Sequence, residues 1–169
     1  MLRRTIAIGI AVLGLSACGA PAPQGAAETA SRLLAAAYKG DRVAFEAEID
    51  RAAVREDVRR QVTRLAKDAT LDVDGGPSEF ALDRMISPAA FRLVHAGSGE
   101  ALRAPPTPAQ VAKLMRTVDA RHACLRDAET PNDGRGADCL LTFAKGKDQW
   151  RLVGMKAMGL KIELADARP

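Results

Sequence analysis

The feature that most constrains the fold of this 169-residue chain is a change in its hydrophobic pattern near Ala120. Before that point, apolar residues recur at the three- and four-residue spacing of amphipathic helices. After it, short apolar runs alternate with turn sequences, which is typical of strands. We therefore expect an α+β domain in which amino-terminal helices pack on a carboxy-terminal three-stranded antiparallel meander.

The first half of the chain predicts three helices. Residues 28–39 carry apolar side chains at helical spacing and are followed by Gly40, the residue type that most often ends a helix. Asp41 and Asp50 stand at N-cap positions, where a carboxylate accepts hydrogen bonds from the first free amides of a helix. The helix after Asp50 is the longest, and one apolar stripe runs through its charged sequence to residue 69.

Two dipeptides predict further helix starts. Ser87-Pro88 and Thr107-Pro108 each combine a capping side chain with a proline. Proline suits the first turn of a helix, because the amide hydrogen that it lacks would have no partner there. We expect helices to begin near residues 88 and 108.

The last third of the chain predicts three strands. Residues 140–143 and 150–153 are apolar runs on either side of residues 145–148, Lys-Gly-Lys-Asp, which have the composition of a tight turn. A segment around Cys124 supplies the third strand. Apolar residues occupy both faces of these strands, so helices should cover one face of the sheet and some further cover should lie on the other.

The first eighteen residues have the three parts of an export signal. Arg3 and Arg4 precede an apolar run of roughly 10 to 14 residues, too short to span a bilayer as a stable helix. The run closes on residues 15–18, Leu-Ser-Ala-Cys, which resemble the lipobox of bacterial lipoproteins. The resemblance implies a signal peptide over residues 1–17, cleavage before Cys18, and lipid on the new terminus. The alternative is a plain signal peptide in which Cys18 is incidental.

A lipid on Cys18 predicts where the protein is found. Each buried methylene contributes about 0.8 kcal/mol, so two or three acyl chains hold a protein at a membrane effectively permanently. We expect a lipid-anchored protein of the bacterial cell envelope that faces the periplasm. Gly19 rather than aspartate follows the cysteine, which favours the outer membrane over the inner. Because this sorting rule differs between bacterial lineages, the inner membrane stays open.

A short tether and one domain account for the rest of the chain. Residues 19–27 lack charge and contain two prolines, so residues 18–27 are interpreted as the lipidated cysteine and a flexible tether. Residues 28–169 are long enough to bury a core and fall within the usual size of one domain. They predict a single α+β domain.

The charge of the chain gives no strong case for nucleic acid. The formal net charge is +4, and two of these charges, Arg3 and Arg4, belong to the predicted signal peptide. The mature protein is therefore only weakly basic, and we expect no nucleic-acid partner. No other apolar run is long enough to cross a membrane.

Two cysteines are left once Cys18 carries lipid. Cys124 and Cys139 each lie in a predicted strand, on either side of the turn-rich residues 130–136, in a protein expected in an oxidising compartment. If the strands pair antiparallel around that loop, the cysteines face each other across the ladder within disulfide reach. Such a bond contributes about 3 kcal/mol in the chain-entropy model. The alternative is two buried free thiols.

Scattered positions resemble one uncharacterised bacterial family. They are Gly40-Asp41, Phe45, Ile49-Asp50, Val54-Arg55, Val58 to Val62, Trp150, Leu152 and Met155. The pattern is similar to that of domain of unknown function 2939, which occurs in small envelope proteins, over residues 28–158. Met155 departs from it, because a β-branched residue is expected there. The resemblance implies one domain with a helical start and a hairpin end, and it implies no catalytic residue.

A basic stripe marks the predicted long helix. Its members are Arg51, Arg55, Arg59, Arg60, Arg64 and Lys67. Only Glu56 and Asp57 oppose it within residues 51–67. In a tethered protein this face is a candidate for contact with anionic lipid head groups, lipopolysaccharide phosphates or an acidic envelope protein. The alternative is an ordinary solvated helix face.

No cluster in the sequence has the spacing of a catalytic or metal site. Asp119, His122 and Cys124 are residue types that ligate metals or form activated nucleophiles. His95 is the only other histidine, however, and no further ligand lies at a diagnostic spacing. A disulfide would also remove the Cys124 thiol. We expect no catalytic residue, no metal and no cofactor.

Two classes of function fit these features. The favoured class is a non-enzymatic envelope lipoprotein whose domain binds a partner. The alternative is a small-ligand carrier or an enzyme with a pocket between helices and sheet, as in cone-shaped α+β folds of the nuclear-transport-factor type. A deep cavity lined by polar side chains would favour the alternative, whereas a filled core with an exposed basic or apolar patch would favour the binding module.

Overall fold

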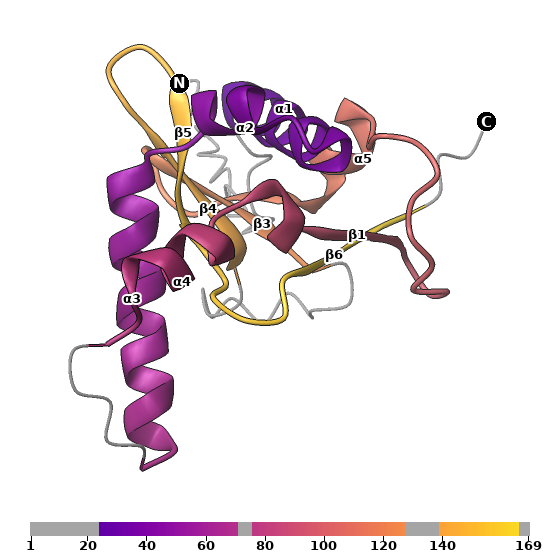
Figure 1. The fold of residues 1–169 in the computed structure, drawn as a ribbon. Coiled ribbons are helices and arrows are strands. Elements are labelled where there is room, and N and C mark those ends of the chain that lie inside the picture. The colour runs from indigo at the N-terminus through magenta and orange to yellow at the C-terminus, as the bar shows by residue number, and fades with distance from the viewer. Residues whose placement is uncertain (1–23, 71–75, 128–138, 166–169) are drawn as a thin grey trace, which may run out of the picture.

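The computed structural model describes residues 24–70, 76–127 and 139–165, and within them the chain forms a mixed helix and strand fold (Figure 1). The helices are α1 (Gln24–Lys39), α2 (Arg42–Ala47), α3 (Arg51–Asp68), α4 (Glu79–Met85), the 3-10 turn η1 (Pro88–Ala90) and α5 (Pro108–Leu114). The strands are β1 (Arg92–His95), β2 (Met115–Thr117), β3 (His122–Arg126), β4 (Cys139–Lys145), β5 (Trp150–Met155) and β6 (Lys161–Leu164). The predicted α+β class is confirmed.

The main sheet has four strands in the order β2-β3-β4-β5, all antiparallel. The hairpin predicted around residues 145–148 is confirmed, because β4 ends at Lys145 and β5 begins at Trp150. The prediction of three strands is wrong: β2 follows α5 directly, and its Met115 lies opposite Leu125 of β3. Three residues are too few to show a two-residue period, so the sequence pattern does not reveal β2.

A second sheet joins parts of the chain that are far apart in sequence. β1 and β6 pair in parallel, with Arg92 opposite Lys161 and His95 opposite Leu164. Neither strand was predicted, since each has four residues and its partner lies more than sixty positions away. This pairing ties the carboxy-terminal end of the described chain to its middle.

The core lies between the helices and the main sheet. α1 packs against β4, β5 and α5, and α3 packs against β5. The largest side chains that are completely buried are Phe45, Phe143, Leu33, Leu34, Leu82, Ile86, Met115, Leu125, Leu141, Leu152, Ile162 and Leu164. The rings of Phe45 and Phe91 meet edge to face, with 5.2 Å between their centroids. Apolar burial of this extent is the main force that holds the layers together.

α1 begins earlier than predicted. Residues 24–27 were assigned to the tether, but the structure places them in the first turn of the helix. Ala26 is completely buried, and a Cβ added at Gly25 would lie 3.0 Å from Cδ1 of Trp150. Small residues are needed here because the helix approaches the indole ring closely, and the same small residues read as a linker in the sequence.

The predicted helix ends agree closely with the structure. Gly40 has a φ of 67°, the left-handed conformation that glycine adopts after a helix. Asp41 and Asp50 accept hydrogen bonds from the amides of Ala44 and Ala53, each at 3.1 Å. These bonds satisfy amides that would otherwise have no partner.

The two proline-containing pairs have different outcomes. Thr107 and Gln110 form a reciprocal capping box at the start of α5, so the helix predicted near residue 108 is confirmed. Near residue 88 the structure has only a three-residue 3-10 turn, and the Ser87 side chain makes no capping hydrogen bond to it. The Ser87 hydroxyl instead donates to the carbonyl of Arg84 at 2.8 Å.

The corner between α2 and α3 extends the main sheet. Ile49 pairs in parallel with Leu152 of β5. The Asp50 amide donates to the Leu152 carbonyl at 2.8 Å, and the Leu152 amide donates to the Glu48 carbonyl at 3.0 Å. This pairing covers the outer edge of β5 and sets the position of α3, whose second half projects beyond the sheet (Figure 1).

Candidate functional site

A disulfide joins Cys124 of β3 to Cys139 at the start of β4, with 2.08 Å between the sulfur atoms and 5.4 Å between the Cα atoms. The sequence interpretation assumed that the two cysteines face each other directly across the ladder, and this is wrong. Cys124 lies opposite Thr142, and Cys139 lies opposite Arg126, because the register shifts between Leu125 and Arg126. The bond is therefore diagonal across the ladder. The predicted loop at residues 130–136 lies outside the described residues.

The basic stripe of α3 meets acidic residues that precede and follow it in the chain. Asp83 of α4 accepts hydrogen bonds from Arg51, at 2.8 Å, and from Arg55. Glu79, one turn earlier on α4, pairs with Arg55 at 3.1 Å and with Arg59. Three arginines and two acids at four-residue spacing thus form a ladder that holds α4 against α3.

The stripe makes further ion pairs outside this ladder. Arg51 also pairs with Glu46 of α2, and Arg60 pairs within α3 with Glu56 and Asp57. In the described part of the chain, Arg64 and Lys67 have no ion-pair partner. The sequence interpretation counted only the acids within residues 51–67, so it missed those of α2 and α4. Two acids four residues apart on a capped helix, Glu79 and Asp83, were the available signal.

The arginines change the acidity of Asp83. The hydrogen bonds from Arg55 and then Arg51 stabilise the ionised carboxylate, so they lower the pKa of Asp83 below the ordinary value of an aspartate. The same hydrogen bond raises the pKa of Arg55. The pair of Asp83 and Arg55 thus favours the charged form of both side chains.

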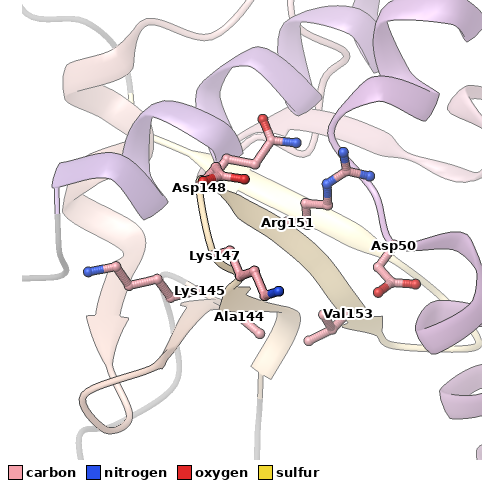
Figure 2. Close-up of a pocket in the computed structure, with 9 residues that line it drawn as sticks. Asp50, Ala144, Lys145, Lys147, Asp148, Arg151 and Val153 are labelled. Atoms are coloured by element: carbon pink, nitrogen blue, oxygen red, sulfur yellow. The ribbon is translucent and has the colours of Figure 1, made fainter.

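A surface hollow of about 460 Å³ lies between the β4–β5 loop and the corner before α3. Its lining residues are Asp50, Ala144, Lys145, Gly146, Lys147, Asp148, Gln149, Arg151 and Val153. Figure 2 shows the Lys147 ammonium group reaching over the hollow, while the Lys145 side chain points to the other side of the loop. Three cations and two aspartates line this hollow, which the sequence interpretation described only as a turn.

Hydrogen bonds to two neighbouring residues hold the Arg151 guanidinium group in place beside the hollow. Turned so that its amide oxygen faces the guanidinium group, the Gln149 side chain accepts from Nε and Nη2 of Arg151 at 2.8 and 2.6 Å. Nη1 donates to the Ile49 carbonyl at 3.4 Å. Within the described residues, neither Lys145 nor Lys147 has an acidic partner, so their charges are available to an outside anion.

Asp119 and His122 form a turn rather than a metal cluster with Cys124. Nδ1 of His122 lies 2.8 Å from a carboxylate oxygen of Asp119. The Arg121 amide also donates to Asp119, at 2.7 Å, and this bond is the largest cause of the lowered pKa of Asp119. Cys124 is held in the disulfide. Across the described ranges, no three His, Cys, Asp or Glu side chains gather closely enough to hold a metal ion.

Comparison with known proteins adds no relative. The chain matches no protein-family model, no curated protein and no solved structure. The resemblance to domain of unknown function 2939 therefore stays a prediction. None of the helices in residues 24–70, 76–127 and 139–165 has the length and apolar character that crossing a bilayer requires.

Proposed function

We propose that this chain is a membrane-anchored lipoprotein of the bacterial envelope whose domain is a non-enzymatic binding module. One observation carries the proposal. Residues 15–18, Leu-Ser-Ala-Cys, close an apolar run that follows Arg3 and Arg4, which is the arrangement that directs lipid to a cysteine. The lipid on Cys18 supplies the membrane attachment.

The disulfide supports this location. Disulfides persist in oxidising compartments such as the bacterial periplasm and are rare in the cytosol. Cys124 and Cys139 are bonded to each other, so Cys18 is the single cysteine left for another role. An exported protein with a lipidated Cys18 accounts for all three cysteines.

The packing between helices and sheet supports a binding module over a carrier or enzyme. Leu33 and Leu34 of α1, with Phe143 and Leu152 of the sheet, are completely buried and fill this layer. The described hollow lies instead at the end of the sheet, and exposed loop residues form much of its wall. A shallow charged hollow suits contact with a larger partner surface better than enclosure of a small molecule.

Fractionation of a bacterial host tests the proposal. We expect the wild-type protein in the membrane fraction and, after detergent phase separation, in the detergent phase. The Cys18→Ser variant should keep its signal peptide and lose the lipid, because a hydroxyl cannot receive the thioether-linked diacylglyceryl group. Ser16→Ala is the matched control, since it exchanges one small residue for another and should be lipidated normally. A wild-type protein with an unmodified Cys18 thiol would refute the proposal.

A further inference from the structure

The tether joins the domain beside the β4–β5 loop. Gly25, in the first turn of α1, lies against the indole ring of Trp150. A Cβ atom built on Gly25 would lie 3.0 Å from Cδ1 of that ring. One turn further along α1, the Thr29 hydroxyl donates to the Trp150 carbonyl at 3.4 Å. Trp150 directly follows the loop of residues 146–149. The loop, orange to yellow in Figure 1, therefore lies at the end of the domain where α1 begins.

The chain between the lipid and α1 is short. Residues 19–23 separate Cys18 from Gln24. The six steps from Cys18 to Gln24 reach at most about 22 Å, at roughly 3.6 Å per residue. A lipid on Cys18 thus keeps the start of α1, and the loop beside it, close to the bilayer surface.

This end of the domain carries more cations than acids. Lys145 and Lys147 are exposed in the loop, and Arg151 lies beside them in the hollow. Arg121 is adjacent, because its carbonyl accepts from the Lys145 amide at 2.8 Å. The acids that line the hollow are Asp50 and Asp148, so its three cations exceed them by one. Asp119, which accepts from the Arg121 amide at 2.7 Å, lies beside the fourth cation.

We infer that the β4–β5 loop is a second membrane contact, at which Lys145 and Lys147 meet the phosphates of anionic lipid head groups and the hollow beside Arg151 receives one of them. The inference rests on the proposed lipid anchor. It assigns this contact to the loop rather than to the α3 stripe, where four of the six cations are paired with acids. Each lysine or arginine close to an anionic membrane raises the affinity of the protein for that membrane about five-fold. The effect fades within about 10 Å at 0.1 M salt.

Trp150 supplies a reporter at the contact, because it is the single tryptophan of the chain. The full-length lipidated protein is reconstituted into vesicles of phosphatidylcholine alone or mixed with phosphatidylglycerol. A fraction of the lipid carries a quencher on its head group. We expect stronger quenching of Trp150 in the phosphatidylglycerol vesicles and a return toward the phosphatidylcholine value as salt is raised.

Matched lysine variants locate the effect. The double variant Lys145→Gln and Lys147→Gln removes two exposed charges, so it should lose most of the added quenching in phosphatidylglycerol vesicles. The control is Lys67→Gln with Lys113→Gln, two exposed lysines on α3 and α5. This control should behave like the wild type. Equal quenching in both lipids, or equal loss in both double variants, would overturn the inference.

The test also separates this inference from the proposal on which it rests. If the purified protein carries no lipid, both fail. If it is lipidated and fractionates with membranes, but Trp150 quenching does not respond to lipid charge, the anchor stands and the loop contact is wrong. Circular dichroism of each double variant confirms that the fold is kept, which makes a loss of quenching specific to charge.

Discussion

At the scale of single residues, Asp57 of α3 contacts the backbone of the main sheet. Its Oδ2 accepts from the Met155 amide at 3.2 Å and from Gln61 Nε2 at 2.8 Å. Gln61 in turn donates to the Met155 carbonyl and accepts from the Ala157 amide. The two side chains thus pair with the backbone as a neighbouring strand would. Gly154 makes the approach possible, because a Cβ there would lie 2.9 Å from Asp57 Oδ2.

Gly154→Ala is expected to lower the free energy of unfolding by about 1–3 kcal/mol, the usual cost of extra volume in a packed site. Urea denaturation measures this loss. In the Asp57→Ala background the same glycine substitution should cost less, because the carboxylate that it meets is gone. Equal costs in both backgrounds would show that Asp57 is not the group that excludes a side chain at this position.

Residue-scale features divide according to how far apart in sequence their partners lie. The caps at Asp41, Asp50 and Thr107 follow from neighbours three residues away, and the sequence predicted them. The contacts of Asp57 and Gln61 reach about a hundred positions along the chain. No local pattern encodes such pairs, because they arise only when α3 packs beside β5.

At the scale of elements, the disulfide fixes β3 to β4. The bonded cysteines are 15 positions apart, and in the chain-entropy model closing a loop of this length stabilises the fold by about 3 kcal/mol. The double variant Cys124→Ala and Cys139→Ala should lower the free energy of unfolding by about 2–4 kcal/mol. Urea denaturation measures the loss. A reductant should lower the free energy of unfolding of the wild type but not that of the variant. Two reactive thiols in the unreduced, unfolded wild type would contradict the assignment.

The ion-pair ladder predicts an acid-sensitive contact between α3 and α4. Because the pKa of Asp83 is lower in the folded protein than in the unfolded chain, its stabilising effect is complete above the ordinary aspartate pKa. The effect is lost as the pH falls through the lowered value. Glu46 and Glu79 pair with the same arginines.

Hydrogen exchange of the α4 amides measures this contact. We expect α4 to exchange faster in Asp83→Asn than in the wild type at neutral pH, by a small amount because the pairs are partly exposed. The difference should shrink at acid pH, where the wild type loses the same charge. Asp148→Asn, in the exposed β4–β5 loop, is the control and should leave α4 unchanged. An unchanged α4 in Asp83→Asn would show that apolar contacts alone hold this helix.

The elements found from the sequence are the long or strongly punctuated ones. The first three helices have clear caps or periodicity, and the β4–β5 hairpin has a clear turn sequence. β1, β2 and β6 have three or four residues each. β1 and β6 also depend on each other across more than sixty positions, whereas β2 pairs with the neighbouring β3. Such short segments carry no period of their own.

At the scale of the whole molecule, two groups of contacts lie at different parts of the domain. α3 and α4 are joined by the ladder of paired charges. The start of α1 and the β4–β5 loop lie together through the contact between Gly25 and Trp150. The sequence predicted a lipid on Cys18 and, separately, a turn that contains Lys145 and Lys147. It did not show that the start of α1 lies beside this loop, because the contact between Gly25 and Trp150 exists only in the folded chain.

Cys18 is the attachment point of the proposed lipid, and intact-mass spectrometry of the protein purified from the membranes of a bacterial host shows whether it is modified. We expect a chain that begins at Cys18, with the mass of a diacylglyceryl group added to that residue. Fragmentation should place the added mass on the first residue and leave Cys124 and Cys139 joined. A mature chain that begins at another residue, or an unmodified Cys18, would rule out the lipid anchor.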